Sequence, residues 1–503
     1  MFQEQFIFKH MNEQIKTKSP SLKINILLNM FYQVLCVITP LITAPYVSRV
    51  LQAGGVGIHS YTSSLMSFFT LFAALGTASY GKRTIAELRD DKFAYSKAFW
   101  EIELITVFTT IICLVFWIVF SLHYAEYRPY MLVLSFTLLA TLFDISWLYG
   151  GLEKFQYTVA VNSIFKVASI ICIFLFVNTK DDVLTYTTIM SLSTLVGSVS
   201  MWLFLPKFIE KGHIEFNSLK NHFRATVIYF GPAIATSIYT VLDKTLIGLI
   251  TVDTAENGYY EQATKMINII KAVCFDAING VMIARASFLF SQHDKEKLLE
   301  IRNTTYHLVS FLSVGACFGI IGVSNLFVPV FFGEGYAPVV FLLDILAVVV
   351  VIIGISSVAN TIYYISGGNM KRATILLLVG SATNLIFNLI LIPKYGSTGA
   401  TVATLVAESV ITILFINGTK GFIKWHNIAS LYWKKIVSGL VMLLGIFIIG
   451  SLLPSASNFM LLVIEILTGG IIYIIMLLLL KDPSVLMALE FIRKRFRGGK
   501  INE

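Results

Sequence analysis

The sequence predicts an all-α polytopic membrane protein with about fourteen transmembrane helices and both termini in the cytoplasm. Three observations support this fold class. Hydrophobic residues make up 56% and charged residues 13% of the 503 positions, whereas soluble domains carry about 25% charged residues. The apolar residues form long runs, and Lys and Arg fall mostly between the runs. A net charge of +9 diluted along such a chain excludes the dense basic face that nucleic acid binding requires.

Fourteen apolar runs are each long enough to cross a hydrocarbon core of about 30 Å at about 1.5 Å per residue. The first six cover 24–46, 57–80, 98–122, 129–149, 157–177 and 183–205. The next six cover 225–251, 259–290, 304–330, 338–365, 374–392 and 397–416. The last two cover 436–453 and 459–480. We therefore expect two lobes of six helices and an additional pair of helices at the C-terminal end.

The distribution of positive charge sets the orientation of these helices, because short cytoplasmic loops are enriched in Lys and Arg. With both termini inside, 29 of the 38 Lys and Arg residues fall in cytoplasmic segments and four in outer loops. The other five lie inside predicted helices: Lys166, Lys244, Lys265, Lys271 and Arg285. A single missed helix would destroy this bias, so the even number of helices and the cytoplasmic termini follow together.

The predicted helices divide the chain into six parts. These are a cytoplasmic N-terminal segment (1–23), an N-lobe (24–205), a cytoplasmic linker (206–224), a C-lobe (225–416), helices 13 and 14 (417–480) and a basic cytoplasmic tail (481–503). The N-terminal segment lacks the apolar core of a signal peptide, and the tail suits an anionic inner leaflet. The lobes have the same orientation because each contains six crossings, as expected of a repeat.

Two sequence features indicate that the second lobe repeats the first. Gly150-Gly151-x-x-Lys154, after the fourth helix, recurs as Gly367-Gly368-x-x-Lys371 after the tenth. The first and seventh helices both contain proline, which removes a backbone hydrogen bond and bends a helix. We therefore predict hinges at Pro40, Pro45 and Pro232.

The charges inside the helices predict an aqueous cavity, because an ionisable side chain at the centre of a bilayer costs at least about 2.5 kcal/mol. At about 100° per residue, polar residues of the eighth helix fall within one arc of about 80°. They are Glu261, Lys265, Asn268, Asp276 and Asn279. This stripe predicts the wall of a cavity; the alternative is internal pairing, with Glu261 and Lys265 joined as an ion pair one turn apart.

Depth in the membrane separates the buried cations. Lys271 lies about 18 Å along the eighth helix and Lys166 about 14 Å along the fifth, both near the centre of the bilayer. We therefore expect Lys166, Lys265 and Lys271 to hold an anionic group, since Lys provides a point charge for phosphate. Arg285 lies about 39 Å along its helix, past the core. Arg285 is accordingly a candidate for a gate or interfacial anchor, together with Arg49 and Lys244.

The buried acids are candidates for binding a coupling ion. Asp144, Asp243 and Glu408 lie in apolar runs, where a carboxyl group must be paired, protonated or bound to a cation. The alternative is that these side chains form hydrogen bonds between helices. The five cysteines and eight histidines are scattered without the spacing of a metal site, so we predict neither a metal site nor a disulfide.

Five motifs in order resemble a known family. They are Pro45-Tyr-Val-Ser-Arg-Val-Leu51, Gly76 with Tyr80-Gly81, Asp144-x-x-Trp147-Leu-Tyr-Gly-Gly-x-Glu153-x-Phe155, Asp243-Lys244-x-x-Ile247-Gly248, and Ile392-Pro-Lys-Tyr-Gly396-x-x-Gly399-Ala-x-Val-Ala-Thr404. Together they resemble the Wzx-type polysaccharide biosynthesis flippases of the multidrug/oligosaccharidyl-lipid/polysaccharide (MOP) superfamily. Gln52 is a departure, because such proteins commonly have glycine at that position.

The resemblance implies a MATE-like fold of two six-helix lobes around a cavity, with the last two helices outside. It also implies a function: alternating access that moves an undecaprenyl-diphosphate-linked oligosaccharide repeat unit from the inner to the outer leaflet of a bacterial plasma membrane, for O-antigen or capsule-type polysaccharide. A polysaccharide polymerase and glycosyltransferases are implied partners, beside membrane lipid. No cofactor and no enzymatic activity are expected.

Three alternatives remain open from the sequence. A drug/cation antiporter of the same superfamily would use the buried carboxyl groups to bind organic cations. A flippase for teichoic acid or lipid II would share the expected fold and cavity. A membrane-embedded glycosyl or phosphoglycosyl transferase would need a sizeable extramembrane domain or an acidic loop cluster, and the longest loops between the predicted helices hold only about 19 residues.

Overall fold

The computed structural model describes residues 22–210, 214–453, 457–487 and 489, and every regular element within these ranges is a helix. Eleven of these helical stretches are long and apolar enough to cross a membrane. Two of them, α2 (Leu22–Ala74) with α3, and α14 (Met370–Gly418), each cover two predicted spans, and α9 (Phe216–Ile250) is the seventh predicted span. The expected all-α membrane fold with about fourteen spans is therefore confirmed. Most of the predicted N-terminal segment and basic tail lies outside the described residues.

The chain forms two compact units whose boundaries differ from the predicted lobes. Unit 1 comprises the chain up to Ile42, Met66–Asn178 and Leu184–Ile234, and unit 2 comprises Thr43–Leu65, Thr179–Val183 and the chain from Ala235 onward. Helices α2 and α9 are each divided between the units, whereas the sequence assigned each helix to one lobe.

The divisions of α2 and α9 fall at the predicted hinges. The boundary in α2 lies between Ile42 and Thr43, and so between Pro40 and Pro45; the boundary in α9 follows Ile234, two residues after Pro232. Backbone angles remain helical at these positions, so bending there stays a prediction.

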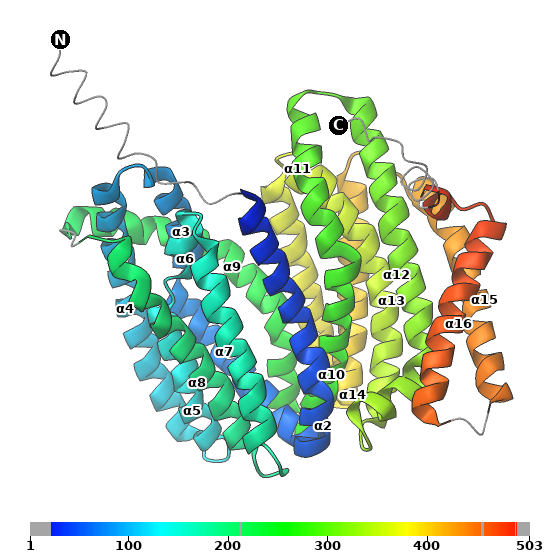
Figure 1. Cartoon of the computed structure of the whole chain (residues 1–503), viewed down its shortest axis with the longest axis horizontal. Helices are drawn as coiled ribbons and strands as arrows, with labels where there is room; N and C mark the ends of the chain where they lie inside the picture. The colour runs from blue at the N-terminus through cyan, green and yellow to red at the C-terminus, as the bar shows by residue number, and fades with distance from the viewer. Residues whose placement is uncertain (1–21, 211–213, 454–456, 488, 490–503) are drawn as a thin grey trace. The chain divides into compact units, whose positions relative to one another are not determined.

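The helices of unit 1, whose course Figure 1 shows, pack around a core rich in aromatic rings. Its elements are α3 (Thr77–Leu88), α4 (Lys92–His123), α5 (Arg128–Phe143), α6 (Ser146–Gly151), α7 (Phe155–Phe176), α8 (Val183–Met201) and the 3-10 helix η1 (Trp202–Lys207). Phe99 of α4 stacks on Trp147 of α6, with ring centroids 5.4 Å apart. Gly81 of α3 lets the Trp147 ring pack directly against that helix, because a Cβ at Gly81 would lie 2.5 Å from the ring.

Unit 2 contains the larger hydrophobic core. Its elements are α10 (Thr254–Lys271), the π-helical turn η2 (Ala272–Asp276), α11 (Ala277–Ser291), α12 (Lys295–Phe332), α13 (Ala337–Ala359), the π-helical turn η3 (Asn360–Ile365), α14, α15 (Trp425–Leu452) and α16 (Asn458–Leu479). Helices α12, α13 and α14 pack in sequence, and α15 and α16 pack against each other and against α12.

The first and second predicted spans follow each other within one helical stretch, and so do the eleventh and twelfth. In each stretch a sharp backbone break stands where a turn was predicted. The break in α2 occurs at Gln52 (φ 59°, ψ 177°) and the break in α14 at Gly396 (φ 54°, ψ −131°). Positive φ favours glycine, so Gly396 is suited to its turn whereas Gln52 is strained. The departure from the family pattern thus falls on the residue whose backbone conformation most favours glycine.

Two predicted helices are interrupted in the structure. The fourth was expected to extend through Tyr149, but α5 ends at Phe143, and Asp144 accepts a hydrogen bond from the Ser146 amide (3.0 Å) before α6 begins. Short polar side chains favour such local bonds over helix continuation. The eighth predicted helix is divided by η2, and a π-helical turn changes the angular register of the residues that follow it.

The two lobes share a structural device at the site of the predicted repeat. The buried Tyr149 hydroxyl donates to the carbonyl of Met201 (2.6 Å), and the buried Tyr364 hydroxyl donates to the carbonyl of Phe415 (2.9 Å). In both cases a tyrosine shortly before the Gly-Gly motif, one residue before Gly150 and three before Gly367, is bonded near the end of a helix about fifty residues downstream. This correspondence supports the internal repeat.

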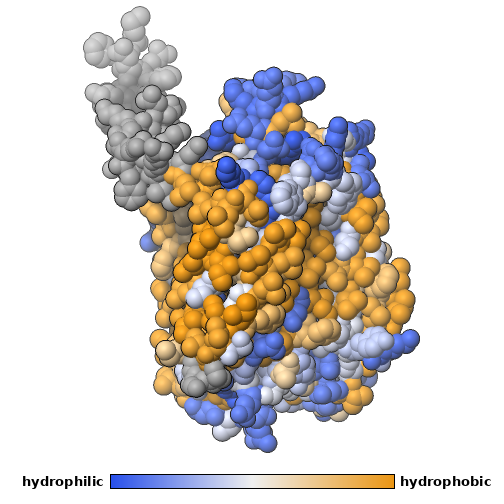
Figure 2. All heavy atoms as spheres, turned by 90° about the vertical axis from the view of Figure 1, so that its right-hand side faces the viewer, coloured by the Kyte–Doolittle hydropathy of each residue, from blue (hydrophilic) through white to orange (hydrophobic). Residues whose placement is uncertain are grey.

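The outer faces of the helices are apolar. Figure 2 shows one side of the molecule, where hydrophobic residues gather in the middle and hydrophilic residues lie above and below them. Exposed large apolar side chains of α15 and α16 include Leu444, Phe447, Ile448, Phe459, Leu467 and Ile471. Such a surface is expected where a helix faces lipid.

Candidate substrate cavities

Unit 1 encloses a cavity of about 310 Å³, here called the unit 1 cavity. Its walls come from α2, α7, α8 and the break between α5 and α6. The lining residues are Tyr32, Asp144, Ser146, Asn162, Phe165, Lys166, Ser169, Met190, Ser193, Thr194, Gly197, Ser198 and Met201. Most carry hydroxyl, amide or charged groups, so this cavity inside an apolar unit is suited to a polar ligand.

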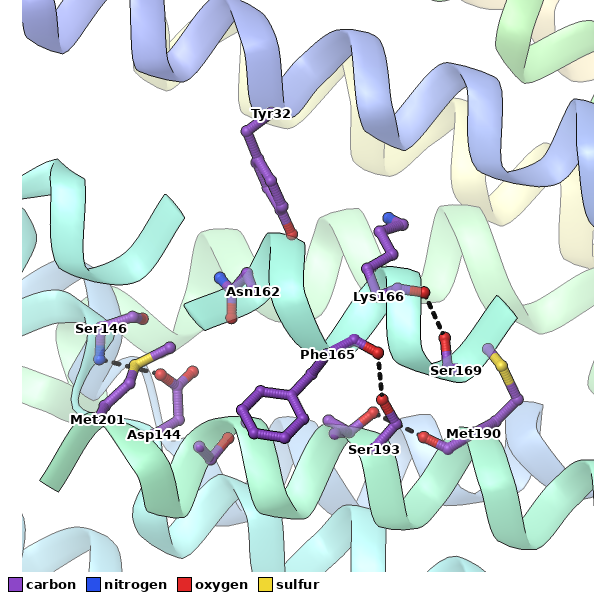
Figure 3. Close-up of a pocket in the computed structure, with 13 residues that line it drawn as sticks. Tyr32, Asp144, Ser146, Asn162, Phe165, Lys166, Ser169, Met190, Ser193 and Met201 are labelled. Atoms are coloured by element: carbon purple, nitrogen blue, oxygen red, sulfur yellow. Dashed lines mark hydrogen bonds between the residues drawn. The ribbon is translucent and has the colours of Figure 1, made fainter. Parts of the chain in front are cut away.

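Lys166 is the cation of the unit 1 cavity. Its Nζ lies 3.2 Å from the Sγ of Cys36 and 5.7 Å from the centre of the Tyr32 ring. Figure 3 shows the Lys166 amine pointing toward α2, on the opposite side of the cavity from Asp144. Within the described residues Lys166 forms no ion pair, so its charge is available to an anion.

Hydrogen-bonding groups surround this lysine. Asn162 lies one helical turn before Lys166 on α7, and both face the space below Tyr32 (Figure 3). Across the cavity, the Ser193 hydroxyl of α8 donates to the backbone carbonyl of Phe165 (2.9 Å), which ties α8 to α7. The cavity therefore combines one cation with several neutral donors and acceptors.

Unit 2 contains a smaller cavity of about 110 Å³, here called the unit 2 cavity. Its lining residues are Thr240, Asp243, Lys244, Tyr260, Thr264, Ile267, Asn268, Lys271, Leu346, Val349, Ile353, Asn384, Thr404 and Glu408. Lys271 has no ion pair within the described residues, although it interacts electrostatically with Asp276. Two acids, Asp243 and Glu408, line the same space, so this cavity has mixed charge.

Asp243 lies at the centre of a buried hydrogen-bond network. Its Oδ2 accepts from the Tyr260 hydroxyl (2.5 Å) and the Thr404 hydroxyl (3.0 Å), and its Oδ1 accepts from the Asn388 amide (2.6 Å). The same Asn388 amide nitrogen donates to Asn384 (2.9 Å), and the Asn388 carbonyl oxygen is buried without a partner. Donors from α10 and from both halves of α14 thus converge on one carboxyl group of α9.

Glu261 and its two lysines form a second charged cluster. The Glu261 carboxylate lies 2.6 Å from the Nζ of Lys244 and 3.1 Å from the Nζ of Lys265, and it also accepts from the Ser60 hydroxyl (2.9 Å). The internal pairing considered from the sequence is therefore present for Glu261 and Lys265. Of the three candidate anion-binding lysines, Lys166 and Lys271 lack such a carboxylate partner.

The polar stripe of the eighth predicted helix is only partly realised. Of the stripe residues, Asn268 lines the unit 2 cavity. Glu261 and Lys265, which pair with each other, do not line it, and neither do Asp276 and Asn279, which follow η2. The stripe assumed a regular 100° per residue, and the π-helical turn breaks that regularity.

The candidate gate residues lie in three different environments. Arg49 donates to the carbonyl of Val330 (2.5 Å) at the end of α12, and Lys244 is part of the Glu261 cluster. Arg285 is exposed on α11. The backbone at the predicted hinge Pro232 is helical, and its side chain lies outside the described part of the structure.

Sequence reasoning missed two residues that line the cavities and one buried acid that lines neither. Tyr32 and Tyr260 carry no charge and lie in apolar runs, so only the three-dimensional contacts reveal them. Glu103 of α4 is different, because a carboxylate within the third apolar run is visible in the sequence. It is 3% exposed, and neither carboxylate oxygen has a hydrogen-bond partner.

The chain is similar in sequence to a polysaccharide biosynthesis family and to curated proteins named as O-antigen transporters and as a glycan biosynthesis flippase. The family model described as "Polysaccharide biosynthesis protein" matches residues 22–283, which is just over half of the chain. The "Putative O-antigen transporter" of Escherichia coli K12 is 22% identical over 409 residues, covering 80% of this chain and 97% of that protein. The "Probable low-salt glycan biosynthesis flippase Agl15" of Haloferax volcanii is 26% identical over 244 residues, covering 46% of this chain and 49% of that protein.

Solved structures share the fold. The lipid II flippase MurJ, in an inward closed conformation, superposes with a TM-score of 0.70 at 17% identity, over 91% of this chain and 99% of that one. An inward-facing multidrug resistance MATE transporter of the MOP superfamily superposes with a TM-score of 0.54 at 13% identity, over 78% and 95%. The family model covers more than half of the chain, so the chain belongs to the polysaccharide biosynthesis protein family.

Proposed function

We propose that this protein is a flippase that moves an undecaprenyl-diphosphate-linked oligosaccharide repeat unit from the inner to the outer leaflet of a bacterial plasma membrane by alternating access. The observation that carries the proposal is Lys166, a cation without a carboxylate partner in a polar cavity of unit 1. The similarity to O-antigen transporters supports the substrate class. Both termini are cytoplasmic in this proposal, as the positive-inside bias requires.

The chemistry of the unit 1 cavity matches the three parts of such a substrate. A diphosphate is held by a fixed positive charge, and hydrogen bonds to charged groups contribute about 1.5 to 3 kcal/mol. Sugar hydroxyls pair with side chains such as Asn162, Ser193 and Thr194. The prenyl chain needs no polar contact because it stays in the lipid.

The unit 2 cavity offers a second cation of the same kind. Lys271 and Asn268 lie one turn apart on α10, and both line that cavity. We assign Lys271 to diphosphate contact during part of the transport cycle. Lys265 remains a candidate whose role depends on release of its bond to Glu261.

The candidate coupling residues all reach a cavity. Asp144 lines the unit 1 cavity, and Asp243 and Glu408 line the unit 2 cavity, so each carboxyl group can exchange an ion with the space where the substrate would bind. Movement between the two access states is assigned to Pro40, Pro45 and Pro232, where the compact units divide.

The test is export of surface polysaccharide by cells that depend on this protein. We expect Lys166→Gln and Lys271→Gln each to reduce surface polymer at least tenfold at unchanged protein level, because each removes a phosphate contact. Lys180→Gln, an exposed lysine outside both cavities, is the matched control and is expected to export normally. Full export by both cavity variants would overturn the assignment of these lysines.

The same cells separate the rival functions. Normal surface polymer with increased drug sensitivity after gene deletion would indicate a drug/cation antiporter. Loss of growth with accumulation of cell-wall precursor would indicate a lipid II or teichoic acid flippase. The polymerase and glycosyltransferases that supply and consume the repeat unit are proposed partners, to be tested by co-purification.

A further inference from the structure

Glu103 is a buried carboxyl group, and within the described residues no hydrogen bond or ion pair stabilises its ionised form. It is 3% exposed in the middle of unit 1, and both of its oxygens lack a hydrogen-bond partner. An ionised carboxylate in such surroundings costs many kcal/mol, so the group is neutral and holds a proton. A structural role would require a hydrogen bond or an ion pair, and within the described residues Glu103 has neither.

Aromatic contacts show which way the face of α4 that carries Glu103 is directed. Phe99 lies one helical turn before Glu103 on the same face of α4, and its ring contacts both Trp147 and Trp202. The Trp202 indole donates to the carbonyl of Phe143, the residue before Asp144 (2.9 Å). The face of α4 that carries Glu103 is therefore directed at the break between α5 and α6, and the two carboxyl groups interact electrostatically.

Asp144 differs from Glu103 because it reaches the unit 1 cavity. It is a lining residue there, and one carboxylate oxygen accepts from the Ser146 amide (Figure 3). The pair thus consists of an inner carboxyl group shielded from the cavity and an outer carboxyl group in contact with it. This order is suited to storing a proton and exchanging it with the cavity.

We propose that Glu103 is a proton-binding site that loads and releases one proton in each transport cycle, with Asp144 as the group that exchanges this proton with the unit 1 cavity. On release, a side-chain rotation first brings the Glu103 carboxyl group within hydrogen-bond reach of Asp144; the O–H bond of Glu103 then breaks and a new O–H bond forms on the Asp144 carboxylate. Asp144 then gives the proton to water in the cavity, and loading follows the reverse order. The inference deepens the proposed transport function by naming the ion that drives it.

The other charged groups near α4 have partners of their own. On α4 itself, Lys97 pairs with Glu215 (2.8 Å), and the buried Glu101 lies 3.1 Å from His222 of α9 and accepts from the Ser218 hydroxyl (2.6 Å). Helix α3 carries Lys82 over the Phe155 ring, and Arg83 paired with Glu87. Helix α5 carries Arg128 at its opposite end, bonded to the carbonyl of Leu122, and α8 contains no charged residue. Lys166 points toward α2 and away from Asp144 (Figure 3). Asp144 is accordingly the charged neighbour through which a proton can leave.

Infrared difference spectra of the purified full-length protein, recorded across a pH titration, test proton binding without any substrate. We expect a carboxylic acid band that titrates in the wild type and disappears in Glu103→Gln. In Asp144→Asn the carboxylic acid band should be present but should no longer change with pH, because the group that exchanges the proton with the cavity is missing. Retention of the titrating band in Glu103→Gln would overturn the proposal. If Glu103→Gln does not fold, Asp144→Asn tests the proposal instead. A carboxylic acid band that titrates in Asp144→Asn as in the wild type would contradict the role of Asp144 in proton exchange.

A transport assay separates this inference from the proposed function. In proteoliposomes, a pH gradient should accelerate movement of undecaprenyl diphosphate by the wild type, and Glu103→Gln should abolish that acceleration while binding of the lipid stays within twofold. Glu465→Gln, which removes a buried carboxyl group on α16 outside both cavities, should behave as wild type. Lipid binding without any response to the pH gradient would contradict the proton site alone, whereas absence of lipid binding would contradict the proposed function.

Discussion

Replacement of Lys435 by methionine should cost about 3 to 5 kcal/mol of unfolding free energy. The Lys435 side chain is fully buried, and its Nζ lies 3.0 Å from the carboxylate of Asp482, which is 2% exposed. The same Nζ donates to the carbonyl of Leu431 (2.9 Å). Methionine fills a similar volume, so the cost comes mainly from the uncompensated charge left on Asp482 rather than from a void.

The pair connects the C-terminal helices to the rest of unit 2. Asp482 follows α16 and also accepts from the backbone amide of Ser484 (2.9 Å), whose hydroxyl donates to the carbonyl of His307 on α12 (3.0 Å). Lys435 lies on α15. Loss of the lysine should therefore loosen the contact of α15 and α16 with α12 before the remaining helices unfold.

The assay is reversible unfolding of the purified protein in mixed micelles, with Lys434→Met as the matched control. Lys434 is the preceding residue, but it is partly exposed and has no carboxylate partner within the described residues. It contacts a backbone carbonyl and the Trp433 ring, so its loss should cost less than about 1 kcal/mol. Lys435→Met combined with Asp482→Leu should regain most of the lost stability, because the unpaired charge is gone. Equal stability of Lys435→Met and Lys434→Met would refute the reasoning.

Three further changes test other features. Burial alone would raise the pKa of Asp482, but the Lys435 charge and a backbone amide hold this pKa below its usual value. The pair should thus contribute fully above about pH 4 and be lost as the pH falls through the folded-state pKa, a loss that acid titration of Lys435→Met should not show. Gln52→Gly should raise the unfolding temperature by relieving about 1 to 3 kcal/mol of backbone strain. Gly258→Ala should destabilise by more than about 1 kcal/mol, because its Cβ would lie 2.0 Å from a backbone oxygen of α2, whereas Gly470→Ala, in open space, should not.

Much of the fold could be predicted from the sequence because the bilayer imposes a simple rule. Each span must be apolar over its length and helical, so the hydropathy pattern locates the helices and the Lys and Arg bias orients them. The positions where the helices are interrupted were harder to predict from the sequence. The end of α5 before Asp144 depends on one side-chain hydrogen bond, and η2 adds a π-helical turn that no spacing rule indicates.

The candidate sites were predictable only in part. A sequence shows which residues are charged, but it does not show which of them form ion pairs or hydrogen bonds with one another. Lys166, Lys265 and Lys271 look equivalent in their apolar runs, yet the fold pairs Lys265 with Glu261 and leaves the other two without a carboxylate. Glu103 was visible as an acid, but the absence of any partner emerges only when the neighbouring helices are in place.

The most direct measurement of the central claim is the affinity of the purified protein for undecaprenyl diphosphate, compared between the wild type and Lys166→Gln. Loss of one charge-assisted phosphate contact, about 1.5 to 3 kcal/mol, predicts an affinity at least tenfold weaker in Lys166→Gln and unchanged in Lys180→Gln. Equal affinity of the wild type and Lys166→Gln would contradict the claim that the unit 1 cavity binds the diphosphate.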